Sequence, residues 1–329
     1  MTALYDVAAL GNAIVDVIAT AGDDFLEREG LVKGSMALVD AEQSAALYGR
    51  MGAAIETSGG SAGNTIAGVA SLGGRGAFIG KVAGDVLGDV YAHDMAAIGA
   101  SFHGTRLIGG AGTGRCMINV TPDGQRTMCT SLGAATELAP ADVDPKVIEG
   151  ATITYFEGYL FDPEEARKAF AKAAGIARAA NRTIALSVSD SFVVHRHREA
   201  LLAFIAAEVD VLFANDDEIV ALTGAANFAD ATQAIRDKVK IAALTCGAQG
   251  SVVVAGSATH QIDADHIEKV VDTTGAGDQY AAGFLHALAQ GRPLDQCGRL
   301  GNLAASEVIT HYGPRPQVSL KDLAAKAGL

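Results

Sequence analysis

The sequence predicts an α/β fold, a three-layer α/β/α sandwich around a mostly parallel sheet. Short apolar runs alternate with longer amphipathic runs along most of the 329-residue chain. A strand, a helix and a second strand form a right-handed crossover, which makes neighbouring strands parallel and places helices on both faces. The sequence contains no linker, repeat or low-complexity tract, so we expect a single domain over residues 1–329.

The elements follow in order along the chain. The expected strands are short runs rich in apolar residues, at Tyr5–Leu10, Gly76–Ile79, Thr152–Phe156, Thr183–Ser187, Val209–Phe213, Ile241–Thr245 and Ser251–Val254. The expected helices carry apolar residues at helical spacing, over Ala62–Leu72, Val86–Ile98, Pro163–Ala179, Arg196–Ala206, Asp216–Leu222, Ala229–Lys238, Ala276–Ala289 and Pro293–Ile309.

Two segments interrupt this alternation. Residues 14–40 contain the short apolar run Ser35–Asp40 with no long helix behind it. Residues 103–131 contain two strand-like runs, Arg115–Val120 and Gln125–Ser131, around a Pro-Asp-Gly sequence. This sequence predicts a hairpin turn, because Pro presets φ and Gly supplies a positive φ. Together, approximately residues 14–40 and 103–131 predict one small β lid that is discontinuous in sequence.

Composition excludes several classes of protein. With 25 Lys and Arg against 38 Asp and Glu, the formal net charge is −13, which should repel a nucleic acid. The four cysteines are far apart, so neither a disulfide framework nor a zinc site is indicated. The first residues do not resemble a signal peptide, and no apolar run is long enough for a membrane span. We therefore expect a soluble, cytoplasmic protein with no nucleic-acid or membrane partner.

The strongest functional pattern is Asp272-Thr-Thr-Gly-Ala-Gly-Asp278, at the start of an expected helix. Small residues at 275–277 let a ligand approach the backbone, and the free N–H groups of a helix N-terminus attract an anion. A carboxylate beside an anion is costly unless it acts, and Asp278 could act as general base for a substrate hydroxyl. A simple capping aspartate is the alternative. The preceding Asp-Thr-Thr favours the functional interpretation.

Two more polar patterns lie near strand ends. Gly11-Asn12-Ala-Ile-Val-Asp16 follows the first strand, and open α/β sheets bind ligands at the carboxyl ends of strands. Asn12 and Asp16 could hold two neighbouring hydroxyls, or form an Asx-type turn. Ser58-Gly-Gly60-Ser-Ala-Gly-Asn64 leads into a helix. Its glycines permit close approach of a polar ligand, and Asn64 could bind a hydroxyl.

The same stretch contains Gly-x-Ser-x-Gly, which would make Ser61 the nucleophile of an α/β-hydrolase with His286 or His311 as partner. That motif needs a firm strand directly before the serine, and Ala53–Thr57 is a poor one. Two nucleotide motifs are absent from the sequence: Arg75 stands where a P-loop needs its first glycine, and no Gly-x-Gly-x-x-Gly follows the first strand. A phosphate site must therefore use another loop.

Two loops in the second half could serve a nucleotide. Asn215-Asp-Asp-Glu218 follows a strand and could hold a phosphate-bound Mg²⁺ through water, or simply cap a helix. Thr245-Cys-Gly247-Ala-Gln-Gly250 lies between two strands, where a nucleotide could bind or the chain could simply turn.

In their order, GNAIVD, SGGSAGN, the PDG hairpin with Arg126, NDDE, TCGAQG and DTTGAGD resemble the ribokinase-like (PfkB-type) family of carbohydrate and nucleoside kinases. The resemblance covers about residues 6–311. It implies the three-layer fold with a β lid and ATP-dependent phosphorylation of a hydroxymethyl group. It also implies the following roles: Asp278 as base; an anion hole from the amides of Gly275, Ala276 and Gly277; Arg126 at the substrate; Asn215 and Glu218 at Mg²⁺ and phosphate; Thr245, Gly247, Gly250 and Asn302 at the nucleotide; and Asp272 and Thr274 at a monovalent cation such as K⁺.

Within the family, GNAIVD and residues 124–135 and 154–160 look most like the adenosine kinases. This resemblance implies that Asp16, Gly60 and Asn64 hold the ribose and that Asn12 lies near the base. The chain lacks Trp, so other apolar side chains would contact the base. A sugar kinase for ribose, fructose or a keto-deoxy sugar and a non-catalytic nucleoside- or sugar-binding protein remain alternatives, although every reacting position is filled. We expect a monomer, or a homodimer through the lid.

Overall fold

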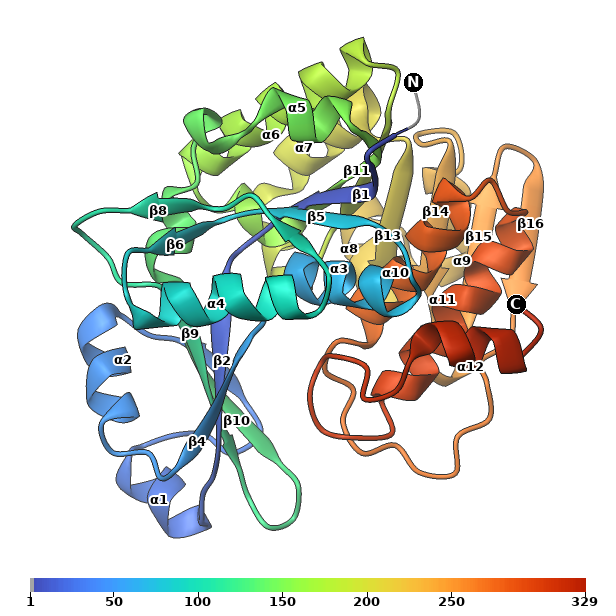
Figure 1. Ribbon diagram of the computed structural model, residues 1–329. Coiled ribbons are helices and arrows are strands. Elements are labelled where there is room, and N and C mark those ends of the chain that lie inside the picture. Colours follow the sequence, from blue (N-terminus) through green and yellow to red (C-terminus); the bar gives the residue numbers. More distant parts are fainter. Residues whose placement is uncertain (1–2) are drawn as a thin grey trace.

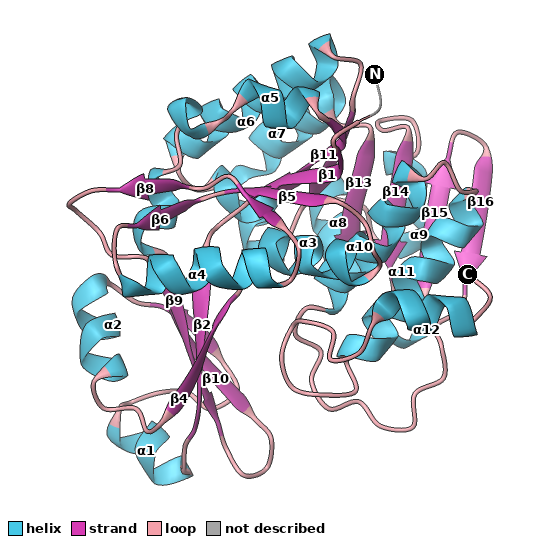
Figure 2. Cartoon of the chain, viewed as in Figure 1, coloured by secondary structure: helices cyan, strands magenta, loops and turns pink. Residues whose placement is uncertain are grey.

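A computed structural model describes residues 3–329 and contains a nine-stranded sheet between two layers of helices (Figures 1 and 2). Neighbouring strands are parallel, with one exception: the strand Ser251–Ala255 is antiparallel to both of its neighbours. The order is β16 (Ala258–Ile262), β15 (Ser251–Ala255), β14 (Ile241–Thr245), β13 (Val211–Asn215), β12 (Thr183–Ser187), β11 (Ala151–Glu157), β1 (Tyr5–Leu10), β5 (Gly76–Ile79) and β7 (Ser101–Phe102).

Each face of this sheet has its own apolar core. Because successive side chains of a strand point to opposite faces, Ala8 and Leu10 of β1 enter one core, and Val7 and Ala9 enter the other. The first core is covered by α5 (Pro145–Glu149), α6 (Glu164–Ala179), α7 (Ser191–Glu208), α8 (Asp216–Thr223) and α9 (Phe228–Ile235). The second is covered by α3 (Ser61–Ser71), α4 (Val86–Ala97), α10 (Ala276–Ala289), α11 (Leu294–Val308) and α12 (Leu320–Lys326).

The expected strands and helices of this main body are all present, some with the predicted bounds and the others with shifted ends. The largest shift is in α7, which begins at Ser191, five residues before the expected Arg196, because Asp190 caps it by accepting a hydrogen bond from the Phe192 amide. Sequence patterns missed β7, β16, α5 and α12, together with the pair β6 (Lys81–Ala83) and β8 (Thr105–Leu107) and the 3₁₀ turns Gly133–Glu137, Pro140–Asp142, Gly158–Phe161 and Gly247–Gln249. None of the helices within residues 3–329 is both long and apolar enough to cross a membrane.

A second, five-stranded sheet projects from the main body (Figure 1). Its strands lie in the order β3 (Met36–Leu38), β10 (Arg126–Ser131), β9 (Gly114–Val120), β2 (Ile14–Thr20) and β4 (Ala54–Ser58). One face packs Met117 and Cys129 against α1 (Asp23–Arg28) and α2 (Ala41–Tyr48). The expected segments 14–40 and 103–131 supply four of these strands, but residues 103–113 lie outside the sheet and β4 comes from a stretch judged a poor strand. β4 is an edge strand whose first two residues are exposed, so it lacks the apolar pattern of a buried strand.

The β9–β10 hairpin has the predicted turn. Gly124 has φ of 84°, and its amide donates to the carbonyl of Thr121 at 2.8 Å. A Cβ at Gly124 would overlap the hydroxyl group of Tyr312, which lies in the loop before α12. The hairpin tip therefore rests against the C-terminal loop of the main body.

Candidate active site

The Asp278 carboxylate lies in the first turn of α10 and is held by two groups from α3. Ser61 Oγ donates to Asp278 Oδ1 at 2.6 Å, and Asn64 Nδ2 donates to Asp278 Oδ2 at 3.0 Å. Burial raises the pKa of Asp278, and the two hydrogen bonds and the charge of Arg315 oppose this rise. A carboxylate with a raised pKa is a stronger base, and its position beside the helix N-terminus fits proton abstraction next to an anion.

Asp16 lies on β2, with only 7% of its surface exposed. The structure of residues 3–329 gives its carboxylate no hydrogen-bond donor, and burial raises the pKa of Asp16 to about 6. Gly59 is required beneath it, since a Cβ there would lie 2.5 Å from Asp16 Oδ2. Gly60 has φ of 82° and caps α3. A buried acceptor without a donor is suited to bind a ligand hydroxyl.

Asn12 is bonded to a buried acid, Glu157, which lies in the stretch 154–160 but was given no site role from sequence. Its backbone N–H and its Nδ2 both donate to Glu157 Oε1, at 3.1 and 2.6 Å, and the amide of Ala62 donates to Glu157 Oε2 at 2.8 Å. Burial raises the pKa of Glu157 to about 7. Glu157 thus joins the loop after β1 to the start of α3, and it leaves Asn12 Oδ1 as the side-chain atom available to a ligand.

The loop before α10 differs from the expected anion hole in one amide. Gly275 has φ of 79°, and a Cβ there would lie 2.6 Å from Pro314 Cα, so only glycine fits. The amide of Ala276 donates to the Thr273 carbonyl at 3.2 Å. A Cβ at Gly277 would meet open space. The amides of Gly275 and Gly277 are therefore the donors available to an anion, and that of Ala276 already has an acceptor.

Asp272 forms an ion pair with Arg126 of β10, which links the second sheet to the loop before α10. Its Oδ1 also accepts from the amide and hydroxyl of Thr274, at 3.0 and 2.6 Å, and its Oδ2 accepts from the Gly313 amide at 3.1 Å. Four donors occupy the four lone-pair sites of a carboxylate. The prediction that Asp272 and Thr274 bind a monovalent cation therefore does not fit this structure, in which a guanidinium supplies the positive charge.

We predict that K⁺ does not activate the protein, because Arg126 already neutralises Asp272. Turnover in KCl should equal turnover in N-methylglucamine chloride at the same ionic strength and Mg²⁺ concentration. Product should be quantified directly by chromatography, which avoids coupling enzymes that need K⁺ themselves. A saturable activation by K⁺ that Asp272→Ala abolishes would contradict this expectation.

Arg126 itself retains hydrogen-bonding capacity. Only 8% of it is exposed, and its Nε and Nη2 are buried without a partner among the described residues. A buried guanidinium with unused donors is costly unless a ligand supplies acceptors. The structure thus brings the predicted residue Arg126 to the site, paired with Asp272 on one side.

Asn215 and Glu218 form a capping box at the start of α8. Asn215 N and Nδ2 donate to the two Glu218 oxygens, both at 2.9 Å, and the Glu218 amide donates to Asn215 Oδ1 at 2.8 Å. Burial raises the pKa of Glu218 to about 7. No cluster of three or more potential metal-binding side chains occurs in residues 3–329. These residues fit Mg²⁺ only in the way Mg²⁺ is usually bound to nucleotides, through water and phosphate with one carboxylate nearby.

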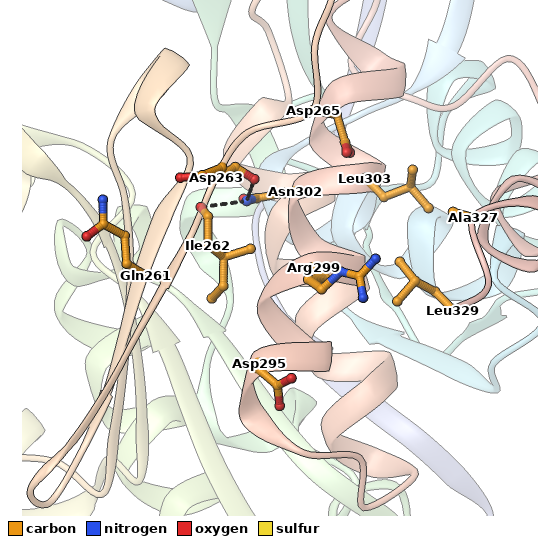
Figure 3. A pocket seen from close by; sticks show the side chains of 10 residues that line it. All are labelled: Gln261, Ile262, Asp263, Asp265, Asp295, Arg299, Asn302, Leu303, Ala327 and Leu329. Carbon is orange, nitrogen blue, oxygen red and sulfur yellow. Dashed lines mark hydrogen bonds between the residues drawn. The ribbon is translucent and has the colours of Figure 1, made fainter.

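Of the remaining predicted nucleotide residues, Thr245 ends β14, Gly247 and Gly250 lie in the loop that follows it, and Asn302 lies on α11. Thr245 pairs in register with Asn215, and a Cβ at Gly247 would meet open space. Gly250 has a structural explanation, since a Cβ there would collide with the carbonyl of Ile262. Asn302 Nδ2 donates to the carbonyls of Ile262 and Asp263 at 3.1 and 3.0 Å (Figure 3).

Asn302 also borders a cavity of about 340 Å³ between α11, the end of β16 and the C-terminus (Figure 3). Asp263, Asp265 and Asp295 line it together with one cation, Arg299. The excess of carboxylates fits hydroxyl and amino groups of a nucleoside better than phosphates. Asn302 therefore lies on the wall of a cavity whose lining suits the polar groups of a nucleoside.

The hydrolase alternative fails on geometry. Ser61 Oγ donates to Asp278 and not to a histidine. His286 contacts Gln290, and His311 contacts Glu307. A serine nucleophile needs a histidine base within hydrogen-bonding reach, and the structure places neither candidate there.

The face of the second sheet that carries Asp16 also carries an apolar cluster. Asp16 lies opposite Cys116, and Ile18 lies opposite Ile118, so period-two alternation puts all four on one face with Ile14. Ile14, Cys116 and Ile118 form a buried cluster there. No sequence motif marked these residues, because their role depends on which face of the sheet they occupy.

Comparison with known proteins gives consistent matches over nearly the whole chain. The description of the pfkB family carbohydrate kinases matches residues 36–320. An adenosine kinase structure from Sinorhizobium meliloti is 51% identical, with TM-score 0.91, covering 98% of this chain and 99% of that one. A probable sugar kinase structure from Rhizobium etli is 46% identical, with TM-score 0.92, covering 99% of both chains. Adenosine kinase of Saccharomyces cerevisiae is 28% identical over 94% of this chain and 96% of the yeast protein. These neighbours confirm the predicted fold class.

Proposed function

The chain belongs to the pfkB family of carbohydrate kinases, and on that premise we propose that it transfers the γ-phosphate of ATP to the 5′-hydroxyl of adenosine, giving AMP. Membership makes it a phosphotransferase with an alcohol group as acceptor. The choice of adenosine is supported by the adenosine kinases among its relatives.

One observation favours a nucleoside over a free sugar. The apolar cluster of Ile14, Cys116 and Ile118 lies on the same sheet face as the buried carboxylate of Asp16. A nucleoside presents a hydroxylated ribose next to a flat, weakly polar base, and it would match a carboxylate next to apolar side chains. A free sugar carries hydroxyls on all sides and would leave part of this surface without polar partners for them.

In the proposed reaction, each group of the chain has a separate task. Asp16 accepts hydrogen bonds from the ribose diol, and Gly60 and Asn64 complete that cradle. Asp278 takes the proton of the 5′-hydroxyl as it attacks, while the amides of Gly275 and Gly277 and the unused donors of Arg126 stabilise phosphate oxygens. Asn215 and Glu218 would hold Mg²⁺ through water. Mg²⁺ neutralises charge on the phosphates when bound.

A panel of acceptors with ATP tests the proposal. Adenosine, guanosine, cytidine, 2′-deoxyadenosine, ribose and fructose should be compared by kcat/KM, with each product identified by mass spectrometry. We expect adenosine to have the highest value. A sugar with the highest value would support the sugar-kinase alternative. Tight nucleoside binding by calorimetry without any product would indicate a non-catalytic binding protein.

We also propose that the five-stranded sheet acts as a lid that closes over substrate. The sheet is anchored by the Arg126–Asp272 pair and by the contact of Gly124 with Tyr312, and closure would exclude water from the phosphate. Adenosine should slow amide hydrogen exchange in residues 115–131 more than in β1 and β11, as measured by mass spectrometry. Protection that is complete without ligand and unchanged by adenosine would show a static sheet.

A further inference from the structure

Arg315 enters the candidate site from the loop between α11 and α12, a segment in which no motif occurs. Its Nε donates to Asn64 Oδ1 at 3.2 Å and its Nη1 donates to Ser58 Oγ at 2.7 Å, while Nη2 lies 3.8 Å from Met95 Sδ. The loop is fixed on α10, because the carbonyl of Pro314 accepts from Gln279 Nε2 at 2.9 Å. Arg315 is therefore held rigidly beside α3 and the start of α10.

The guanidinium determines which way the amide of Asn64 faces. Asn64 presents Oδ1 to Arg315 and Nδ2 to Asp278. If this amide rotated by half a turn, its NH₂ would face the guanidinium and its oxygen would face the carboxylate, and both contacts would be repulsive. Arg315, Asn64 and Asp278 thus form a chain with a single satisfied orientation.

The charge of Arg315 is not cancelled by a direct partner. No carboxylate of residues 3–329 lies within ion-pairing distance of it, yet it opposes the burial-driven rise in the pKa of both Asp16 and Asp278. Burial lowers the pKa of Arg315 itself, and the surrounding acids oppose this change. The ionisable groups that interact with Arg315, Asp16 or Asp278 include Tyr91 and Asp94 on α4, Cys116 on β9, Arg126 on β10, Tyr155 and Glu157 on β11, and Tyr159 after β11.

We propose that Arg315 is a positioning residue for the base: it fixes the amide of Asn64 against Asp278, and it places an uncancelled positive charge beside the carboxylates of Asp278 and Asp16. This role rests on the proposed assignment of Asp278 as base. The proposal goes beyond that assignment because the protonation state of Asp278 then depends on Arg315, a residue far from it in sequence.

The enzymatic test compares Arg315→Met, which removes the charge and the donors, with Arg315→Lys, which keeps the charge. Loss of a charged hydrogen bond costs ~10-fold or more in kcat at neutral pH. Because a positive charge lowers a carboxyl pKa, its loss should move the acidic limb of the kcat profile of Arg315→Met upward by about one pH unit. Arg315→Lys should leave that limb near its wild-type position with an intermediate kcat.

The matched control is Arg236→Met. Arg236 is an exposed arginine that donates to the carbonyls of Gly256 and Ala258, and it contacts no proposed site residue. The Arg236→Met substitution should leave kcat and the pH profile unchanged. A purely structural role for Arg315 predicts a lower unfolding temperature with an unshifted acidic limb, and this result would overturn the proposal.

A second test needs no nucleotide and no turnover. With ¹³C-labelled aspartate, the carboxyl resonances of Asp16 and Asp278, assigned through Asp16→Asn and Asp278→Asn, are titrated in the ligand-free protein. Both midpoints should rise in Arg315→Met and return toward wild type in Arg315→Lys. Unchanged midpoints would refute the proposal even if the enzyme is an adenosine kinase. If the midpoints shift but the protein phosphorylates no nucleoside, the proposed role of Arg315 stands and the proposed function fails.

Discussion

Asp278→Asn should lower kcat by ~10²–10⁴-fold while nucleotide binding persists. The asparagine keeps the size of the side chain and can still contact Ser61 and Asn64, but it cannot accept the hydroxyl proton. Phosphoryl transfer depends mainly on positioning and charge stabilisation, so a residual rate should remain. Single-turnover kinetics would measure the chemical step, and calorimetry with ATP would measure binding.

The pH dependence provides a second measurement of the same group. Burial raises the pKa of Asp278, and the base works only when ionised. Activity should therefore fall as pH decreases through this raised pKa, at a higher pH than for an ordinary aspartate. Asp322→Asn, in the first turn of α12, is the matched control and should leave turnover unchanged. If Asp278→Asn retained near-wild-type turnover, another group would have to be the base.

The sequence was sufficient to predict the main body because its signals are local. Period-two and helical patterns depend on residues a few positions apart, and the strand bounds Tyr5–Leu10, Thr183–Ser187 and Ile241–Thr245 agree with the structure. The edge strands β4 and β16 escaped prediction for a physical reason. An edge strand buries little on either side, so it needs no strict alternation of apolar residues.

The candidate site could be predicted only where its residues stand in contiguous motifs. Asp278, Ser61 and Asn64 come from two such motifs, and the structure joins them by hydrogen bonds. The pair Arg126–Asp272 and the contact between Arg315 and Asn64 connect residues 146 and 251 positions apart. Such contacts depend on how the lid and the C-terminal loop pack on the main body, which no local pattern encodes. For this reason the sequence alone predicts a cation at Asp272, whereas the structure places Arg126 on its Oδ2 and Thr274 on its Oδ1.

Asp16 illustrates how a site residue can be recognised because it lowers the free energy of unfolding. Its folded pKa of about 6 lies above the ordinary value of 3.8 for an aspartate, so the folded state holds its proton more tightly than the unfolded chain does. Above pH 6 the buried charge therefore destabilises the fold relative to a neutral side chain. Asp16→Asn should not lower the unfolding temperature at pH 8, although an ordinary structural aspartate would do so when replaced.

Asp16→Ala should raise the KM for adenosine by ~10-fold or more, because a hydrogen bond to a charged group contributes roughly 1.5–3 kcal/mol and each 1.4 kcal/mol is about tenfold. The wild-type enzyme should lose a comparable factor with 2′-deoxyadenosine, which lacks one of the two hydroxyls. Since the pKa of Asp16 is about 6, the wild-type KM should rise as pH falls through 6, and this rise should disappear in Asp16→Ala. Steady-state kinetics between pH 5 and about pH 8 measure all three effects. Equal kcat/KM for adenosine and 2′-deoxyadenosine would remove Asp16 from the ribose site, because a carboxylate that binds the diol must distinguish the two.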